Sequence, residues 1–438
     1  MVLFLFLVII KIIIINSHKL NNSKEKLLFV SEHFRHGARQ PYSSFDDINW
    51  KDVFNENWKG YGELTPLGMR MHYLLGISNK KQYYDFLKEY NPNEILIRST
   101  NVNRTILSAF STLQGLFNYS NISTLNQKQI NRGIIQNTNY SRDITKIIQN
   151  LGYKTIEGGF SLFPVHIYPT NYDHQYQIFR KDECPGIENY INNVTNNSEV
   201  KNISYDICDK VNKTYGDYIF NFMNKSGVDE PFYLDYYEEE FIKPFMLYDF
   251  DNLFDIADTF VADYFNGKKL KIINDTGINM DDFYIECLNI SSTDSYYRTF
   301  GFSPSELLYI SVSPSFNSLF NYMDKRIELD KKGKSELLVS DSPKFVLIAG
   351  HDNSLALNDL FLKYEFNIDY EKAVYSQSQV YELWKNEMEN KYYIRYLVNQ
   401  KQIALFDYED FKIKVNSKIY SSEMIDEICK GNNAYVDF

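Results

Sequence analysis

Three short apolar segments of the chain have the length and composition of buried β-strands. Residues 27–30 read LLFV, residues 94–99 read EILIRS, and residues 344–349 read KFVLIA. Short, continuous apolar segments are typical of strands that are covered on both faces, as they are in parallel sheets. The pattern therefore predicts a sheet of mostly parallel strands.

Helical patterns follow the first two of these strands. Thr65 is a suitable N-cap, Pro66 suits the first helical position, and apolar residues then recur three and four positions apart. A second helix is predicted around residues 104–117. Towards the end of the chain, residues 374–383 and 392–398 alternate in polarity, and this alternation predicts a β-hairpin.

The middle of the chain has a different pattern. Residues 187–330 are dominated by acidic and aromatic residues, with helical segments at about 235–265 and 303–327 and no strands of the parallel type between them. We therefore predict an α/β fold with a mostly parallel sheet, helices on both faces and an inserted, mainly α-helical cap. The cap takes residues 187–330, and the core takes residues 26–186 and 331–438.

The N-terminus has the pattern of a secretory signal. Val2–Ile10 and Ile12–Ile15 are apolar and are separated by Lys11. The segment is shorter than the roughly 20 residues that a membrane span needs, but it fits a signal peptide over residues 1–17. A short uncleaved anchor is the alternative. No later segment reaches membrane-spanning length, so we expect a soluble mature chain in the secretory pathway.

The charge of the chain argues against one class of partner. The 438 residues include 46 Lys and Arg against 57 Asp and Glu, which gives a formal net charge of −11. Nucleic-acid binding needs a net basic face, so the acidic balance argues against it. It leaves room for a small cationic pocket that takes one phosphate group.

The cysteines and glycosylation motifs agree with a secreted protein. The chain has four cysteines and no C-x-x-C pair, which excludes the usual spacing of a structural zinc site. It permits up to two disulfides among three possible pairings. Asn-x-Ser/Thr motifs are dense from Asn193 to Asn224 and suit a glycosylated surface.

Each of the three predicted strands runs into polar residues at its C-terminal end, which is the edge where open α/β sheets bind ligands. Arginine forks suit the geometry of phosphate oxygens, and Gly37 allows the backbone to approach a ligand closely. The polar residues are Arg35, His36 and Arg39 after the first strand, Asn101, Asn103 and Arg104 after the second, and His351 and Asp352 after the third. Together they predict a tight anion pocket.

These residues carry a resemblance to a known family. Residues 35–41, RHGARQP, resemble the R-H-G-x-R-x-P signature of the histidine acid phosphatases, and residues 350–352, GHD, resemble their second signature. Further matches in the right order lie at residues 62–68, 98–105, 164–166, 184–185 and 382–383. The resemblance covers about residues 27–430 and is weakest in the predicted cap. It implies the phosphoglycerate mutase-like fold of the acid phosphatase and phytase branch.

The resemblance also implies a mechanism. His36 attacks phosphorus and forms a phosphohistidine, and Asp352 protonates the leaving alcohol and then deprotonates the attacking water. An aspartate donates a proton best when it is partly protonated, so we expect an acidic pH optimum. No metal ion or other cofactor is expected, because arginines supply the positive charge. The groups implied to hold the phosphoryl oxygens are Arg35, Arg39, Arg104 and His351.

Several residues near the motifs receive structural roles. His33 lacks a following Gly-x-Arg and is expected to pack at the end of its strand, and His166 is expected to be structural. Arg98 is expected to be a supporting salt-bridge partner. Asn101 and Asn103 stand where relatives often carry aspartates, so they remove negative charge near the phosphate.

The cysteines depart from the family pattern, which often includes more of them. Only Cys184 and Cys429 lie near familiar positions, so the resemblance implies a Cys184–Cys429 disulfide. A Cys208–Cys287 bridge is the weaker expectation.

The function predicted first is a secreted or lysosomal acid phosphatase that acts on small phosphomonoesters. A phytase or a lysophosphatidic acid phosphatase of the same family is the alternative, and the predicted cap would choose the substrate. A phytase needs a more basic rim than this acidic, aromatic segment offers, and a phosphomutase fits the signal segment poorly. From another class, a non-catalytic phosphate-binding glycoprotein stays open. The sequence also leaves a homodimer open.

Overall fold

The computed structural model describes residues 25–41, 60–117, 124–133, 142–156, 162–168, 184–225, 250–267, 279–293, 300–301, 303–334, 342–369 and 374–430. The predicted signal peptide and the first part of the predicted helix at 235–265 lie outside these residues. None of the described helices is long and apolar enough to cross a membrane.

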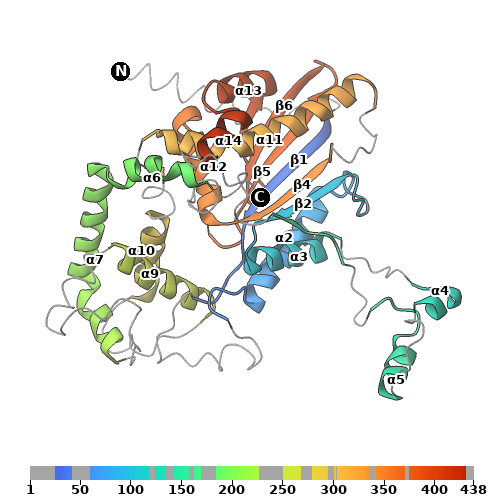
Figure 1. Ribbon diagram of the computed structural model, residues 1–438, viewed down its shortest axis with the longest axis horizontal. Helices are drawn as coiled ribbons and strands as arrows, with labels where there is room; N and C mark the ends of the chain where they lie inside the picture. The colour runs from blue at the N-terminus through green and yellow to red at the C-terminus, as the bar shows by residue number, and fades with distance from the viewer. Residues whose placement is uncertain are drawn as a thin grey trace.

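A mixed sheet forms the centre of the molecule (Figure 1). Its strand order is β3-β2-β4-β1-β5-β6-β7. The strands from β3 to β1 pair in parallel, and those from β1 to β7 pair antiparallel. Their bounds are β1 Glu25–Arg35, β2 Ile95–Ser99, β3 His166–Ile167, β4 Phe345–Gly350, β5 Ser378–Asn386, β6 Lys391–Val398 and β7 Lys401–Asp407. The predicted α/β fold is confirmed, with β5 and β6 as the predicted hairpin and β7 as an additional strand.

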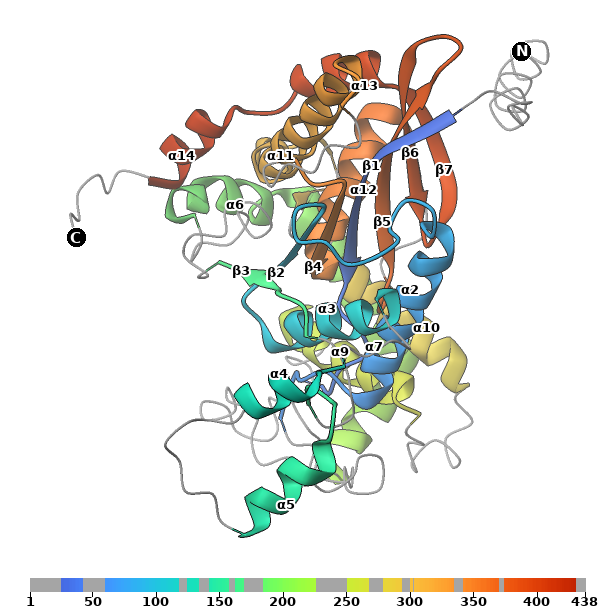
Figure 2. The same cartoon turned by 90° about the vertical axis from the view of Figure 1, so that its right-hand side faces the viewer.

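Helices cover both faces of the sheet, and β4 shows why. Phe345 and Leu347 of β4 pack into the cluster under α2 and α3, whereas Val346 and Ile348 pack into the cluster under α11 and α12. All of β4 is therefore buried, as its continuous apolar sequence predicted. In Figure 2, α11 lies to the left of β1 and α2 to its right. The helices that cover the sheet are α2 Pro66–Gln82, α3 Asn103–Leu116, α11 Glu306–Lys331, α12 Asp352–Phe366 and α13 Tyr408–Asn416.

Two glycines allow α2 and α3 to pack with their backbones in contact. A Cβ added to Gly76 of α2 would lie 2.0 Å from the carbonyl oxygen of Thr112 on α3. A Cβ added to Gly115 of α3 would lie 2.1 Å from the carbonyl oxygen of Tyr73 on α2. The start of α2 follows the predicted pattern, with Thr65 as its N-cap and proline at its first position.

A second group of helices stands beside the sheet and carries its own apolar cluster. Phe260 of α9, Phe283 and Cys287 of α10, and Val211 of α7 belong to this cluster. The helix α11 shares the core of the sheet instead. We call α7, α9 and α10 the cap helices. The bounds of the remaining helices are α4 Gln127–Arg132, α5 Arg142–Leu151, α6 Glu188–Thr195, α7 Ser198–Lys225, α9 Phe250–Phe265, α10 Met280–Thr293 and α14 Ser422–Lys430.

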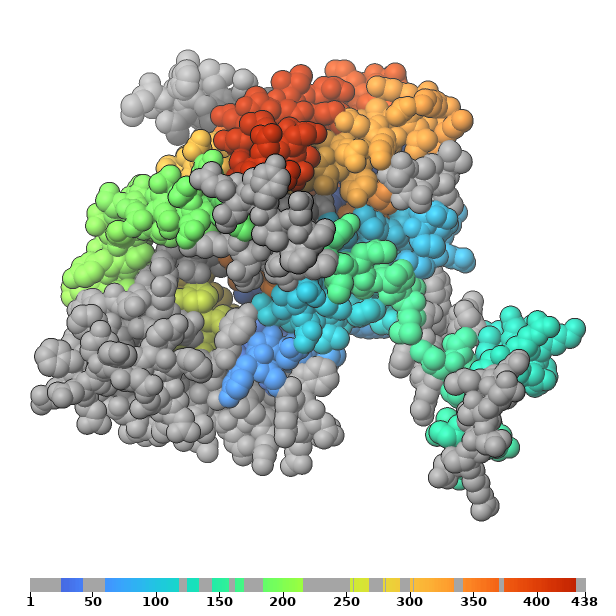
Figure 3. All heavy atoms as spheres, viewed as in Figure 1, coloured from blue at the N-terminus to red at the C-terminus, as the bar shows by residue number. Residues whose placement is uncertain are grey.

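The short helices α4 and α5 lie towards the outside of the molecule. Figure 3 shows α4 and α5 projecting away from the sheet on the side opposite to the cap helices.

A disulfide joins Cys184, just before α6, to Cys429 of α14, across 245 positions of sequence. The predicted Cys184–Cys429 pairing is thus confirmed. The weaker expectation, a Cys208–Cys287 bridge, is wrong, because neither residue belongs to a disulfide and both pack as small apolar side chains in the cap cluster.

One buried carboxyl group in the sheet responds to pH. Glu32 of β1 is fully buried, and Asn79 of α2 donates a hydrogen bond to its Oε2. Burial raises the pKa of Glu32 from 4.5 to about 7, although the hydrogen bond opposes the rise. As pH rises from 4.5 towards 7, the unfolded chain releases this proton before the folded chain does. The fold therefore loses stability over that interval.

The variant Glu32→Gln tests this pH dependence. Relative to the wild type, its free energy of unfolding should improve by about 2–3 kcal/mol between pH 4.5 and pH 7.5, because it lacks the ionisation. Urea denaturation at the two pH values measures the difference. The exposed Glu427→Gln should show no such change. Parallel stability curves for the wild type and Glu32→Gln would contradict the assignment.

Candidate active site

The candidate site lies where β1 and β4 end side by side. The backbone N–H of His36 donates to the carbonyl oxygen of Gly350 at 3.0 Å, and the N–H of Ser376 donates to the carbonyl oxygen of His36 at 3.1 Å. His36 is therefore held between the end of β4 and the turn that precedes β5. It is 2% exposed.

The loop after His36 packs tightly on the start of α2. A Cβ on Gly37 would lie 2.5 Å from the carbonyl oxygen of Gly68, and one on Gly68 would lie 2.2 Å from that of Ala38. The hydroxyl and the N–H of Thr65 both donate to the Ala38 carbonyl oxygen at 3.0 Å. The glycines and the threonine of the two motifs are thus required by the same backbone contact.

The hydrogen bonds of His36 fix its tautomer. Its Nδ1 lies 2.9 Å from the carbonyl oxygen of Gly37, and a carbonyl can only accept. Nδ1 therefore carries the proton of the neutral ring, which leaves a lone pair on Nε2. Burial lowers the pKa of His36 well below 6.5, and the positive charges of Arg104 and Arg35 lower it further. His36 is accordingly an unprotonated imidazole in mild acid.

Asp352 is paired with an arginine. Nη2 of Arg35 lies 2.7 Å from Oδ2 of Asp352, which is the first residue of α12. Burial by itself would raise the pKa of Asp352, but the charges of Arg35 and its neighbours outweigh it and the pKa is lowered. In the unliganded protein this carboxyl group is therefore ionised in mild acid.

His351 lies between Arg104 and a threonine. Nη2 of Arg104 approaches Nδ1 of His351 at 3.4 Å, and Nε2 of His351 lies 3.0 Å from Oγ1 of Thr100. The rings of His36 and His351 are 5.6 Å apart, edge to face. The three strand ends thus deliver Arg104, His351 and His36 to one place.

Arg39 is bound by a cap helix. Its Nη2 donates to both carboxylate oxygens of Asp258 on α9 at 2.6 and 2.7 Å, and Nδ2 of Asn266 donates to its carbonyl oxygen at 2.9 Å. Asp258 is 4% exposed. Sequence reasoning missed Asp258, because an aspartate in an acidic segment gives no signal of its distant partner.

Tyr375 is a second residue that sequence reasoning missed. The guanidinium carbon of Arg35 lies 4.6 Å from the centre of its ring, and the ring of His36 lies 5.8 Å from it. The alternating pattern assigned Tyr375 only to the start of a strand, and a tyrosine among 36 carries no local signal.

The other residues near the motifs lie outside this cluster. Arg98 stacks on Tyr168 at 4.1 Å. Asn101 and Asn103 are exposed, and Asn103 donates to Glu63 at 3.0 Å. His166, in β3, is also exposed.

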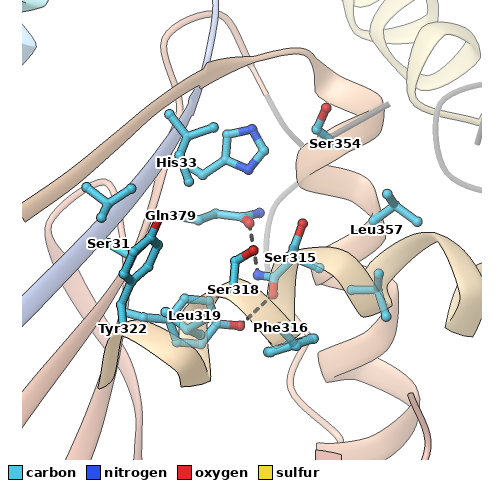
Figure 4. A pocket seen from close by; sticks show the side chains of 15 residues that line it. Ser31, His33, Ser315, Phe316, Ser318, Leu319, Tyr322, Ser354, Leu357 and Gln379 are labelled. Carbon is cyan, nitrogen blue, oxygen red and sulfur yellow. Dashed lines mark hydrogen bonds between the residues drawn. The ribbon is translucent and has the colours of Figure 1, made fainter. Parts of the chain in front are cut away.

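His33 lines a separate cavity between the sheet and the helices α11 and α12 (Figure 4). Serines and apolar side chains line it, including Ser31, Ser354, Phe316 and Leu319. Burial lowers the pKa of His33 to about 3, so the ring is neutral. The cavity contains no arginine among its lining residues, and it is distinct from the arginine-rich cluster.

The described residues contain no group of three or more His, Cys, Asp or Glu side chains arranged to hold a metal ion. We call the cluster of Arg35, His36, Arg39, Arg104, His351 and Asp352 the anion site. It combines the unprotonated imidazole of His36, the imidazole of His351, three guanidinium groups and one carboxylate. This set can bind a tetrahedral oxyanion and offer it a nucleophile, and the carboxylate can donate a proton once it has taken one up.

Comparison with known proteins shows which family the chain resembles over most of its length. The model of the histidine phosphatase superfamily (branch 2) matches residues 26–399. Human prostatic acid phosphatase is 41% identical over 104 residues, which are 23% of this chain and 26% of that protein. Lysosomal acid phosphatase of Xenopus laevis is 39% identical over 108 residues, 24% of each chain. The chain therefore aligns with about a quarter of the length of these relatives.

Solved structures share the fold over most of the chain. A phytase from Klebsiella sp. ASR1 superposes with a TM-score of 0.53 and 11% identity over 91% of this chain and 97% of that one. A multiple inositol polyphosphate phosphatase from Bifidobacterium longum superposes with a TM-score of 0.55 and 13% sequence identity over 90% of each chain. At such identities the likeness shows the fold.

The variant Gly37→Ala tests the backbone contact that supports the anion site. The added methyl group would displace the loop from Gly68 and misplace His36, so affinity for inorganic phosphate should fall by about tenfold or more, as expected when a hydrogen bond to a charged group is lost. Isothermal titration calorimetry measures it. Gly133→Ala, where a Cβ would meet nothing closer than 3.3 Å, should bind as the wild type does. Unchanged affinity in Gly37→Ala would refute the requirement.

Proposed function

The chain belongs to branch 2 of the histidine phosphatase superfamily, and we propose that it hydrolyses phosphate monoesters through a phosphohistidine at His36. The observation that carries the proposal is the state of His36: a buried, neutral ring whose Nδ1–H is bound to a carbonyl oxygen, with a lone pair left on Nε2 beside arginines. A nucleophile of this kind needs no base to activate it.

The first chemical step transfers the phosphoryl group. The Nε2 lone pair of His36 forms a bond to phosphorus while the bond from phosphorus to the ester oxygen breaks. The leaving oxygen takes a proton from the carboxyl group of Asp352. Arg35, Arg39 and Arg104 hold the non-bridging oxygens together with His351 and stabilise the charge of the transition state.

The second step returns the site to its starting state. A water molecule attacks phosphorus, the bond from phosphorus to Nε2 breaks, and Asp352 takes the proton that the water releases. Inorganic phosphate and the free imidazole are the products. His36 and Asp352 are therefore the proposed catalytic residues, and the other four bind substrate.

The ion pair of Arg35 and Asp352 links substrate binding to the proton donor. In the unliganded protein Arg35 favours the ionised carboxylate. A bound phosphate dianion competes for Arg35 and repels the carboxylate, so the pKa of Asp352 rises and the group can hold the proton that the first step needs. Because His36 stays unprotonated in mild acid, the rate should be highest at acidic pH and fall as Asp352 ionises.

The substrate class is a small phosphomonoester. The cap helix α10 begins with Met280, Asp281 and Asp282, and this acidic start disfavours a polyphosphorylated substrate. A panel of an aryl phosphate, a lysophosphatidate and phytate separates the acid phosphatase from the two related activities. A non-catalytic phosphate-binding glycoprotein would release phosphate from none of them.

The compartment proposed is an oxidising and acidic one on the secretory pathway. The Cys184–Cys429 disulfide suits an oxidising lumen, and the buried Glu32 makes the fold more stable in acid. Similar proteins include ones named lysosomal acid phosphatase.

Replacement of the nucleophile tests the proposal directly. At about pH 5, His36→Ala should lose essentially all release of p-nitrophenol from p-nitrophenyl phosphate. The wild type mixed with labelled substrate and quenched in alkali, where phosphohistidine survives, should carry covalent label that His36→Ala lacks. The exposed His166→Ala should behave as the wild type does. An active His36→Ala would refute the mechanism.

Replacement of the proton donor separates the two steps. Asp352→Asn should lower turnover of alkyl phosphates by about 10²- to 10⁴-fold, because a poor leaving group needs a proton. With p-nitrophenyl phosphate the first step should persist, giving a burst of nitrophenol and accumulation of phosphohistidine. Asp369→Asn, whose side chain is 77% exposed, is the matched control. Equal losses for aryl and alkyl esters without a burst would exclude Asp352 as the donor.

A further inference from the structure

Tyr375 occupies a place in the anion site that no motif assigns. It lies in the short turn at residues 374–377, between α12 and β5, and its side chain is 4% exposed. The ring belongs to the apolar cluster of the cap helices and meets Phe265 of α9 edge to face at 5.1 Å. It therefore touches the cap on one side and the anion site on the other.

A carboxylate and an aromatic ring contact the guanidinium of Arg35. Its Nη2 is bound to Asp352 at 2.7 Å, and its carbon lies 4.6 Å from the centre of the Tyr375 ring. A cation over an aromatic face in a buried site is attracted by the ring quadrupole. The carboxylate fixes one edge of the guanidinium and the ring fixes its plane.

The backbone around Tyr375 is also tied to the catalytic loop. The N–H of Ser376 donates to the carbonyl oxygen of His36, and the N–H of Arg35 donates to the carbonyl oxygen of Gln377 at 3.0 Å. Ser376 has a φ of 60°, in the left-handed region that is unfavourable for a non-glycine residue. Such strain persists where the surroundings enforce it, often at functional sites.

From these contacts we propose that Tyr375 is a positioning residue that holds Arg35 in the orientation needed to bind a phosphoryl group, through the face of its ring. The proposal rests on the proposed function for its catalytic consequence, but the positioning itself concerns phosphate binding. Arg35 is shared between Asp352 and the bound anion. The Tyr375 ring keeps the plane of the guanidinium in place while the hydrogen bonds of Arg35 pass from Asp352 to the bound anion.

The hydroxyl group of Tyr375 suggests a competing role. Within the described part of the chain, Oη of Tyr375 is buried and has no hydrogen-bond partner. It could donate to an oxygen of the bound anion, in which case the hydroxyl and not the ring face would matter. A pair of variants distinguishes the two roles, because Tyr375→Phe removes only the hydroxyl and Tyr375→Leu removes the aromatic face.

The first experiment measures the affinity for inorganic phosphate by calorimetry at pH 5. Tyr375→Leu should bind roughly 5- to 30-fold more weakly than the wild type, the range of a buried cation–π contact. Tyr375→Phe should bind within about twofold of the wild type. Equal weakening in both variants would overturn the proposal and make the hydroxyl a ligand of the anion. Thermal denaturation verifies that both variants fold.

The second experiment tests whether Tyr375 acts through Arg35. In a double-mutant cycle, Tyr375→Leu should change phosphate affinity by less than about twofold when Arg35→Met is already present, because the cation that the ring positions is absent. A purely structural role of the ring would weaken binding by the same factor in both backgrounds and would overturn the proposal. Both measurements use binding alone, so a wild type that binds phosphate but hydrolyses no ester refutes the proposed function without deciding the role of Tyr375.

Discussion

The parallel pairing of β4 between β1 and β2 is the constraint on which the site depends. In this register Arg35 pairs with Gly350, and Ser99 pairs with Ala349. All three strands therefore end at the same level, and the next few residues of each meet above the edge of the sheet. A slip of one residue in either pairing would turn the side chains at the strand end to the opposite face. The site is built by this register, since its members are separated by up to about three hundred positions in the sequence.

Carboxylates balance the positive charge of two arginines in the site. Of the three arginines, Arg35 is bound to Asp352 and Arg39 to Asp258 before any anion arrives. These carboxylates lessen the cost of gathering buried positive charge in an otherwise acidic protein. The two carboxylates lie on different parts of the fold. Asp258 belongs to the cap helix α9 and accepts hydrogen bonds from Nη2 of Arg39 with both of its oxygens, whereas Asp352 lies at the edge of the sheet. Asp258 thus connects the cap to the loop that follows β1.

The sequence predicted the features that depend on residues close together in the chain, and it missed those that depend on distant residues. Contiguous segments indicated the three central strands, at residues 27–30, 94–99 and 344–349, and therefore the α/β fold. They also indicated the N-cap at Thr65 and the polar residues at the strand ends. The strand β7 was missed, because its pattern is weak and its partner β6 had already been assigned to a hairpin. Asp258 and Tyr375 were missed because their importance comes only from contacts with Arg39 and Arg35. No local pattern records such contacts.

The disulfide between Cys184 and Cys429 has a topological consequence. It closes a covalent ring that contains α6, the cap helices, α11, β4 and the antiparallel part of the sheet. A protease that cuts once inside this ring opens the circle but separates no fragment, so the pieces stay at high effective concentration and can remain assembled. A single cut in this ring would therefore leave the two pieces of the chain covalently joined.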